Sequence, residues 1–482
     1  MSPEVCCPQG RLKLHRRGAW RSLSGALALC TIASAPAWAE RPAPDLKAGQ
    51  AAYVQSCARC HGATGKGDGV DAKRFYPRPR DFTVGVYKFR STASGTPPTD
   101  EDLYRTISHG LPGTNMPDWP HLDDPTRWQL VAYLKSLSPV FTQAEPKPVT
   151  LAPDPGPQRA DVSKGKATFQ VLGCAACHGP QGRANGTSAG GLVDDWGWPV
   201  RPADLTQGWA YRGGSDPRAI MTRLLAGIDG SGMPSYAEAV SPEDAWPLAY
   251  YVASLQEPAH WNMIAHPLFV DGPLPTAFDD PRWAQAEQTD VRVRNVVTPE
   301  GEWREPPTIR AVTFRAVYDR EGLALRFSWD DPTREATVPP DGLAWLLKPA
   351  DHQGDVVTLQ AWPIAEGPAL DLCYWSADRG QAIEAVSDDY EAVRTGRAPH
   401  ETLESVAAYD DGRWTLILQR PFHPMRPAGA AAMTSDGFTS MAVAIWDGGN
   451  PAARAVSPWV ELVLHPPAGG STSAHAGRTS TH

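Results

Sequence analysis

The chain has 482 residues, of which 41% are hydrophobic and 21% are charged. This length suits about three domains of ~150 residues each, and no apolar run reaches the ~18–20 residues that a membrane span needs. The composition therefore excludes collagen-like, disordered and integral membrane proteins. The 48 prolines and 43 glycines favour loop-rich domains with extended connectors over a long helical bundle.

Residues 1–39 have the pattern of a secretory signal peptide. A basic stretch at 11–21 leads into an apolar run at 23–35, and Ala37-Trp38-Ala39 gives the small-x-small pattern of a cleavage site. We therefore expect an exported, periplasmic protein that is cleaved near Ala39. Without this segment the formal net charge changes from −9 to about −13. Such an acidic protein disfavours nucleic acid as a partner and suits docking on a basic protein surface.

Two Cys-x-x-Cys-His strings stand out, Cys57-Ala58-Arg59-Cys60-His61 and Cys174-Ala175-Ala176-Cys177-His178. This spacing is typical of c-type haem attachment, in which two thiols bond one porphyrin and the adjacent histidine binds its iron. A structural zinc site would need four ligands, and each string offers three. A thioredoxin-like redox pair would not require the histidine. The sequence therefore predicts two covalent haem c groups, attached through Cys57 and Cys60 and through Cys174 and Cys177.

Both strings belong to an internal repeat. Met116 lies 59 residues after Cys57, Met233 lies 59 residues after Cys174, and a proline follows each methionine. A glycine and an aromatic residue recur before each string, and a tryptophan and a tyrosine recur after each methionine. We expect these residues to lie where a first and a last helix cross, because glycine allows an aromatic side chain of the other helix to approach closely. The matching residues are Gly49, Tyr53, Trp128 and Tyr133 in the first copy and Gly165, Phe169, Trp246 and Tyr251 in the second.

Each copy of the repeat resembles a class I cytochrome c domain. The resemblance implies two small all-α domains, at residues 40–139 and 160–257, joined by a proline-rich linker at 140–159. It also implies axial iron ligands in addition to the covalent attachment. A histidine and methionine pair leaves the iron six-coordinate, so the resemblance implies electron transfer rather than catalysis. The implied axial ligands are His61 and Met116 for one haem and His178 and Met233 for the other, with His109 and His121 as rival ligands near Met116.

Two arginine–proline pairs also recur, each three residues before an aspartate. They are Arg78-Pro79 before Asp81 and Arg201-Pro202 before Asp204. One interpretation is a bidentate pairing of each arginine with haem propionates. The other is a solvated loop charge beside a turn proline, and the sequence leaves both open.

After a second proline-rich stretch, at 258–281, the spacing of apolar residues changes from helical to alternating. The pattern predicts one hairpin from 311–319 and 323–331 and another from 404–409 and 414–420. Further strands are expected at 355–363, 369–376, 442–447 and 459–465. Many short strands at regular spacing predict an all-β sandwich over 258–466, followed by a disordered tail at 467–482. Cys373, on one of these strands, is expected to be a buried, inert thiol.

The predicted sandwich resembles the haem-binding (gamma) subunit of ethylbenzene-dehydrogenase-type molybdenum enzymes of the dimethyl sulfoxide reductase family. The segments that carry the resemblance are 355–360, 373–377, 444–449 and 455–460. The resemblance implies that the redox partner is a molybdopterin enzyme.

Members of that family hold a b-type haem in the sandwich, between a methionine and a lysine. Here residues 365–371 contain no methionine, and Arg454 stands where the lysine is expected. A guanidinium stays protonated and is a very poor iron ligand. Two haem c groups are therefore predicted, and an added haem b is an alternative that would need substitute ligands. The substitutes would come from Lys348, His352, His423, Met425, Met433 and Met441.

Together these features predict a periplasmic dihaem c-type cytochrome, an electron-transfer protein or subunit rather than an enzyme. Its electrons would pass between a partner oxidoreductase, such as a molybdenum enzyme complex, and a soluble or membrane-bound carrier. Three alternatives stay open. They are a trihaem subunit with haem b in the sandwich, a dihaem peroxidase-like enzyme with one open iron position, and a sandwich that binds a carbohydrate or another small ligand.

Overall fold

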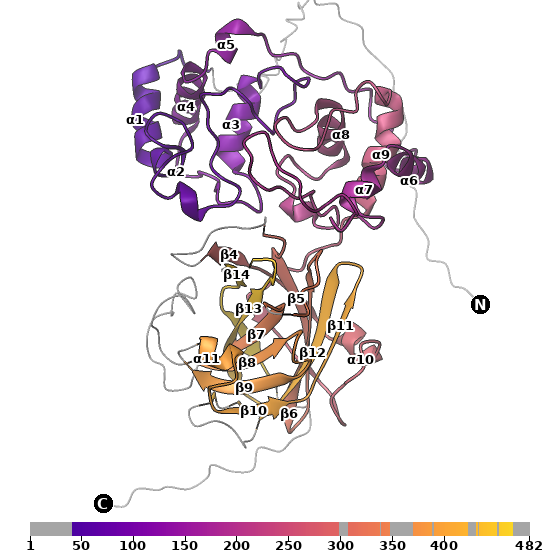
Figure 1. Ribbon diagram of the computed structural model, residues 1–482. Helices are drawn as coiled ribbons and strands as arrows, with labels where there is room; N and C mark the ends of the chain where they lie inside the picture. The colour runs from indigo at the N-terminus through magenta and orange to yellow at the C-terminus, as the bar shows by residue number, and fades with distance from the viewer. Residues whose placement is uncertain are drawn as a thin grey trace, which may run out of the picture. The chain divides into compact units, whose positions relative to one another are not determined.

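The computed structural model describes residues 41–297, 307–337, 339–347, 370–387, 390–422, 430–431, 433–450 and 453–465. Helices dominate up to residue 254 and strands dominate from residue 264 onward (Figure 1). This division confirms the expected helical N-terminal part and β-rich C-terminal part. The predicted signal peptide, the strand at 355–363 and the tail at 467–482 lie outside the described residues.

The first helical region repeats a simple capping chemistry at its helix starts. Asp45 accepts hydrogen bonds from the first turn of α1, Thr99 forms a capping box with Asp102 on α3, and Asp123 caps α4. These side chains satisfy backbone N–H groups that have no partner within a helix. The elements of this region are α1 (Leu46–Ser56), α2 (Ala58–His61), the 3₁₀ turn η1 (Ala72–Arg74), α3 (Asp100–His109), α4 (Asp124–Ser136) and α5 (Val140–Gln143).

The second helical region follows with a similar order of elements. They are α6 (Val162–Val171), α7 (Cys174–His178), η2 (Gly208–Ala210), α8 (Pro217–Ala226) and α9 (Pro242–Ser254). The predicted helix crossings are confirmed in both regions. A Cβ atom at Gly49 would lie 2.8 Å from Cβ of Tyr133, and one at Gly165 would lie 2.8 Å from Cβ of Tyr251. The first helix of each region can therefore pack tightly on the last one only because it has a glycine at the crossing.

The proline-rich segment at 140–159 packs against both helical regions. Ala93 donates its N–H to the Lys147 carbonyl at 2.7 Å, and Val149 donates to the Ser91 carbonyl at 2.9 Å. On the other side, the indole N–H of Trp246 donates to the Ala152 carbonyl at 3.1 Å. The segment expected to be a stiff, extended linker is thus also a packed part of the fold.

The β-rich region consists of two sheets that share one apolar core. One sheet has the order β11-β12-β6-β5-β2, with β3 also paired to β5. The other has the order β1-β15-β13-β7-β8-β9-β10, with β14 on β13 and β4 on β14. Side chains from both sheets fill the space between them, among them the buried tryptophans Trp329, Trp345, Trp375 and Trp414. The short helix α10 (Pro281–Gln285) covers the outer face of the first sheet through Trp283.

Both predicted hairpins are present. β5 pairs with β6 so that Tyr318 lies opposite Leu323, and β11 pairs with β12 so that Tyr409 lies opposite Trp414. Cys373 is fully buried on β8, as expected. The strands are β1 (Ile264–Ala265), β2 (Leu268–Phe269), β3 (Gln288–Arg292), β4 (Arg294–Val297), β5 (Ala311–Tyr318), β6 (Gly322–Asp330), β7 (Gly342–Leu347), β8 (Leu370–Ser376), β9 (Ala382–Ser387), β10 (His400–Leu403), β11 (Ser405–Asp410), β12 (Arg413–Pro421), β13 (Phe438–Trp446), β14 (Ala453–Val456) and β15 (Val460–Val463).

None of the helices in the described residues combines the length and the hydropathy that a bilayer span requires.

Candidate haem sites

The two Cys-x-x-Cys-His strings form the same local structure, a single helical turn that ends on glycine. The turns are α2 and α7, and they are followed by Gly62 with φ of 79° and Gly179 with φ of 78°. This left-handed conformation suits glycine and lets the chain leave the turn directly after each histidine.

Cys57 packs against the apolar core of the first region, and Cys174 lies in the apolar core of the second. Burial, with a contribution from Cys60, raises the pKa of Cys57 to about 12. Burial also raises the pKa of Cys60 and of Cys174. Each string thus presents two thiols directly before a histidine, the set of groups that covalent haem attachment uses.

The two histidines are held by equivalent hydrogen bonds. The Nδ1 atom of His61 lies 3.0 Å from the Arg80 carbonyl oxygen, and Nδ1 of His178 lies 2.9 Å from the Ala203 carbonyl oxygen. A carbonyl only accepts, so Nδ1 carries the proton and Nε2 presents a lone pair. Burial lowers the pKa of both imidazoles, which favours the neutral form. A neutral histidine oriented through Nδ1–H is the form that binds iron through Nε2.

The two methionines lie in equivalent loops. The carbonyl of Met116 accepts from a backbone N–H five residues upstream at 3.0 Å, and the carbonyl of Met233 does so at 3.1 Å. The N–H of Met116 donates to the hydroxyl of Thr114 at 3.1 Å, and that of Met233 donates to Ser231 at 3.3 Å. The equal spacing in the sequence thus corresponds to one loop structure that occurs twice.

Among the buried polar atoms of the first helical region that have no hydrogen-bond partner within the described residues, two belong to aromatic side chains. They are the indole Nε1 of Trp119, three residues after Met116, and the hydroxyl of Tyr87. Buried donors of this kind normally have a partner. The propionates of a haem would supply acceptors, so the residues present fit this group.

The recurring arginines and aspartates have different surroundings in the two regions. Arg78 donates to the Ala72 carbonyl at 2.9 Å, and its guanidinium lies 4.6 Å from the ring centre of Trp198. Arg201 instead lines a cavity. Asp81 and Asp204 each accept from the N–H and the hydroxyl of the threonine two residues later. The aspartates therefore stabilise turns, and only Arg201 of the two arginines is placed toward a cavity.

Contacts that the sequence did not predict join the two helical regions. The guanidinium of Arg80, whose carbonyl holds His61, lies 4.0 Å from the ring centre of Trp196. Arg90 is fully buried and pairs with Asp229 at 2.7 Å. The loop that carries Met233 thus contacts the first region through Asp229. His61 is hydrogen-bonded to the backbone of Arg80, whose side chain contacts the second region.

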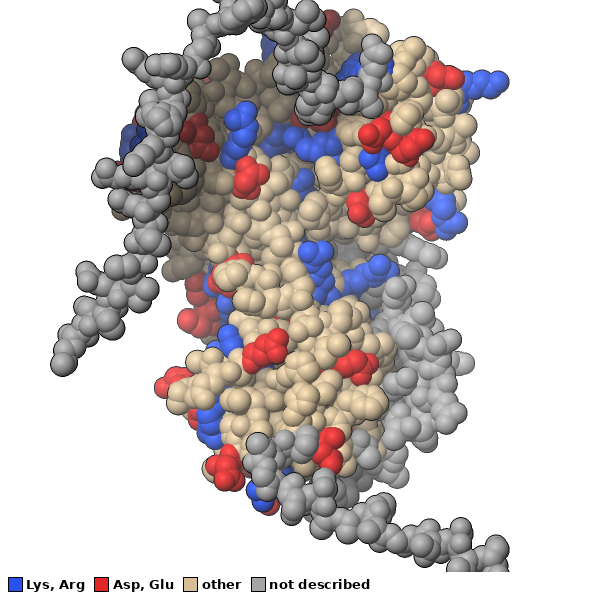
Figure 2. Space-filling model, turned by 180° about the vertical axis from the view of Figure 1, so that it is seen from behind, with Lys and Arg blue, Asp and Glu red and all other residues tan. Residues whose placement is uncertain are grey.

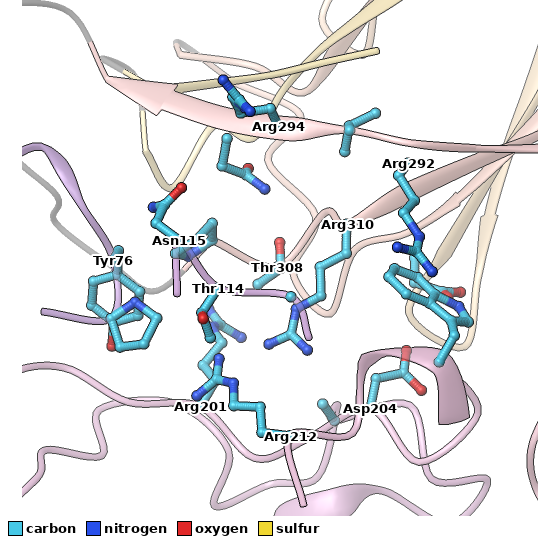
Figure 3. Close-up of a pocket in the computed structure, with 18 of the residues that line it drawn as sticks. Tyr76, Thr114, Asn115, Arg201, Asp204, Arg212, Arg292, Arg294, Thr308 and Arg310 are labelled. Atoms are coloured by element: carbon cyan, nitrogen blue, oxygen red, sulfur yellow. The ribbon is translucent and has the colours of Figure 1, made fainter. Parts of the chain in front are cut away.

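A cavity of about 1060 Å³ is lined by residues of both helical regions and of the β-rich region. Arg310, from the β-rich region, points into it from one side, and Arg201 and Arg212 point into it from the other (Figure 3). The charged residues that line it are Lys88, Arg183, Arg201, Arg212, Arg292, Arg294 and Arg310, with Asp204 and Asp330.

Comparison with known protein families decides the type of these helical regions. The family model of cytochrome c oxidase, cbb3-type, subunit III, matches residues 44–134 and 160–252. The helical part of the chain is thus of the cytochrome c type, which implies covalently bound haem c.

Two curated proteins are similar to parts of this chain. A putative respiratory nitrate reductase heme subunit, ORF7, of Haloferax mediterranei is 26% identical over 165 residues, which are 33% of this chain and 58% of the relative. The cbb3-type cytochrome c oxidase subunit CcoP of Azospirillum sp. is 28% identical over 220 residues, 43% of this chain and 61% of the relative. The chain thus spans about three fifths of the length of each relative.

Among solved structures, a chain of the reducing HAO-like protein complex Kustc0457/Kustc0458 of Kuenenia stuttgartiensis is 41% identical to this chain. The match covers 45% of this chain and 100% of that chain, with a TM-score of 0.43.

Proposed function

We propose that the chain is an exported dihaem cytochrome c that passes electrons between a partner oxidoreductase and a soluble or membrane-bound carrier. Cys57 and Cys60 attach one haem and Cys174 and Cys177 attach the other. The axial ligands are His61 and Met116 at the first site and His178 and Met233 at the second.

The observation that carries this proposal is the duplication of contacts around the predicted ligands. Each histidine has its Nδ1 on a backbone carbonyl, and each methionine lies in the same hydrogen-bonded loop. A core-filling methionine would not need such a loop. Because the two histidines have equivalent contacts and so do the two methionines, the contacts support two sites with the same chemistry.

At each site the residues of the chain orient the histidine and keep it neutral. The carbonyl that accepts from Nδ1 fixes the ring and its tautomer, and burial keeps the imidazole neutral. A haem held there supplies a one-electron ferric/ferrous couple. A histidine and a methionine together would hold the iron of that group, and the thioether would favour its ferrous state. Electron transfer is therefore the reaction that the site supports.

The proposed partner is a molybdopterin enzyme of the dimethyl sulfoxide reductase family. The Haloferax relative is named as a haem subunit of a respiratory nitrate reductase, which supports a respiratory reductase as the partner. The resemblance of the β-rich region to the gamma subunits of molybdenum enzymes points the same way. On the face in Figure 2, Lys and Arg side chains lie among Asp and Glu side chains, so charge of one sign does not mark a docking surface on that face.

Removal of one pair of cysteines at a time tests the site assignment. We expect Cys57→Ala/Cys60→Ala and Cys174→Ala/Cys177→Ala each to lose one of two covalent haems, as measured by intact-protein mass and haem absorbance. Cys373→Ala, a buried thiol outside both sites, is the control and should keep both. Loss of both haems from a folded double variant, or retention of both, would contradict two independent sites.

A further inference from the structure

Arg212 and Arg310 face the same cavity from different parts of the chain. Arg212 follows η2 in the second helical region, and Arg310 precedes β5 in the β-rich region (Figure 3). Within the described residues, neither guanidinium takes part in a hydrogen bond or an ion pair. Arginine side chains that are taken out of bulk water normally have such partners. The arrangement of these two guanidiniums around one cavity therefore favours the binding of an anion.

The acidic residues of the cavity are already engaged with other groups. Asp330 accepts from Arg183 at 2.9 Å, from Arg413 at 2.7 Å and from Gln207 at 2.8 Å. Asp204 accepts from Thr206 at 2.8 and 2.6 Å. Neither carboxylate has a direct ion pair with Arg212 or Arg310 among the described residues. Among the described residues, these two arginines thus have no carboxylate in direct ion-pair contact, although the charge of Asp204 partly offsets that of Arg310.

Electrostatics agrees with this geometry. Burial and the nearby Arg310 lower the pKa of Arg212 to about 9. Burial also lowers the pKa of Arg310. A ligand with negative charge would relieve both effects, because an opposite charge stabilises the protonated guanidinium. Two guanidiniums suit carboxylates in particular, since each can bind both oxygens.

The walls of the cavity come from both candidate haem sites. Gly113 to Asn115 and Pro117 line it on either side of Met116. The guanidinium of Arg310 lies 3.6 Å from the position that a Cβ atom at Gly113 would take. From the second site, Arg201 and Asp204 line the cavity on either side of the residue whose carbonyl holds His178. The cavity thus adjoins residues that neighbour the predicted ligands of both sites.

We propose that Arg212 and Arg310 bind carboxylates in this cavity and that these carboxylates are haem propionates. The inference rests on the proposed function. It assigns the β-rich region a part in the electron-transfer centre, because Arg310 places its positive charge beside a haem. That charge stabilises the ferrous form and raises the midpoint potential of the haem. The same chemistry would also suit a free dicarboxylate or oxyanion, which the test must separate.

The test is a spectroelectrochemical titration of the holoprotein. We expect Arg310→Gln and Arg212→Gln each to shift at least one of the two haem couples about tenfold toward the ferric form, which is ~59 mV for one electron. Arg310→Lys should retain most of the wild-type potential. The matched controls are Arg320→Gln on the β5–β6 turn and Arg218→Gln on α8, both exposed. Shifts no larger than those of the controls would overturn the proposal.

A second arm separates the two sources of carboxylate. The wild-type potentials are measured with succinate, phosphate or nitrate added at constant ionic strength. Propionates that occupy the arginines predict no saturable response. A saturable response that Arg310→Gln abolishes would overturn the propionate assignment in favour of a free anion.

Haem content distinguishes failure of the inference from failure of the proposed function. A wild-type chain without covalent haem would refute the proposed function. A chain with two haems whose potentials ignore Arg212→Gln and Arg310→Gln would refute only the inference. If the glutamine variants do not incorporate haem, the potentials of Arg212→Lys and Arg310→Lys are compared with those of the exposed controls. Because lysine keeps the charge but loses the bidentate contact, a small shift toward the ferric form that exceeds those of the controls supports the proposal. A shift no larger than those of the controls counts against it.

Discussion

In the first helical region residue 67 is a glycine with φ of 73°, whereas the equivalent residue of the second region is Ala184 with φ of 58°. The outer surroundings differ as well. Arg183, beside Ala184, pairs with Asp330 of the β-rich region at 2.9 Å, while Arg90 of the first region pairs with Asp229 of the second. The contacts that hold the histidines and methionines are nevertheless the same. The two regions therefore share what the candidate site needs and differ where each meets a neighbour.

The largest effect is expected at the contact between the two regions. Arg90 is 0% exposed, and its removal would leave Asp229 without its buried partner. We expect Arg90→Ala to lower the free energy of unfolding by about 3–5 kcal/mol, measured by chemical denaturation. Arg105 is half-exposed and pairs with Asp102. Arg105→Ala should lower the free energy of unfolding by about 1 kcal/mol or less. Equal losses in the two variants would show that the two regions do not depend on this contact.

The helix crossings test whether the two helical regions are packed alike. In Gly49→Ala and Gly165→Ala the new methyl group would meet the backbone and a tyrosine Cβ of the opposite helix. Each substitution should lower the free energy of unfolding by about 1–3 kcal/mol, and the two losses should be alike. Gly190→Ala is the control, because a Cβ atom there meets no atom within 4 Å. A large loss of stability in only one of the two variants would show that the two helix crossings are not equivalent.

The smallest effect concerns the position that differs. Ala184 has a left-handed backbone, which is unfavourable for alanine and not for glycine. We expect Ala184→Gly to raise the free energy of unfolding by up to ~1 kcal/mol, and Gly67→Ala to lower it. Thermal unfolding of the two variants beside the wild type would check both signs. A destabilised Ala184→Gly protein would show that packing of the buried methyl group outweighs the backbone preference.

Local patterns in the sequence predicted much of this molecule. The cysteine strings, the methionine spacing and the glycine–aromatic pairs follow from short-range geometry, and the structure bears out the helix crossings. The two hairpins were predictable because alternating strands flank a turn. β7 was not, since all six of its residues are buried and it shows no alternation. β1 and β2 are two-residue strands within a proline-rich stretch that read as a connector.

The cavity could not be predicted from the sequence. Arg212 and Arg310 lie far apart along the chain, and no local pattern links a loop of a cytochrome region to the residue before a strand. The contact between Arg80 and the ring of Trp196 also joins residues that no local pattern links. Such contacts depend on how regions far apart in the sequence pack, which the spacing of residues in a single sequence does not specify. The recurrence of Arg78 and Arg201 suggested equal roles, yet only Arg201 lines the cavity.

A pyridine haemochrome assay of the protein, with haem counted before and after extraction by acidified solvent, tests the presence of two haem c sites most directly. Covalent haem c stays with the chain, and haem b is extracted. The account predicts two haems per chain and none in the extract. One haem per chain would contradict two equivalent sites, and an additional extractable haem would place a third haem in the protein.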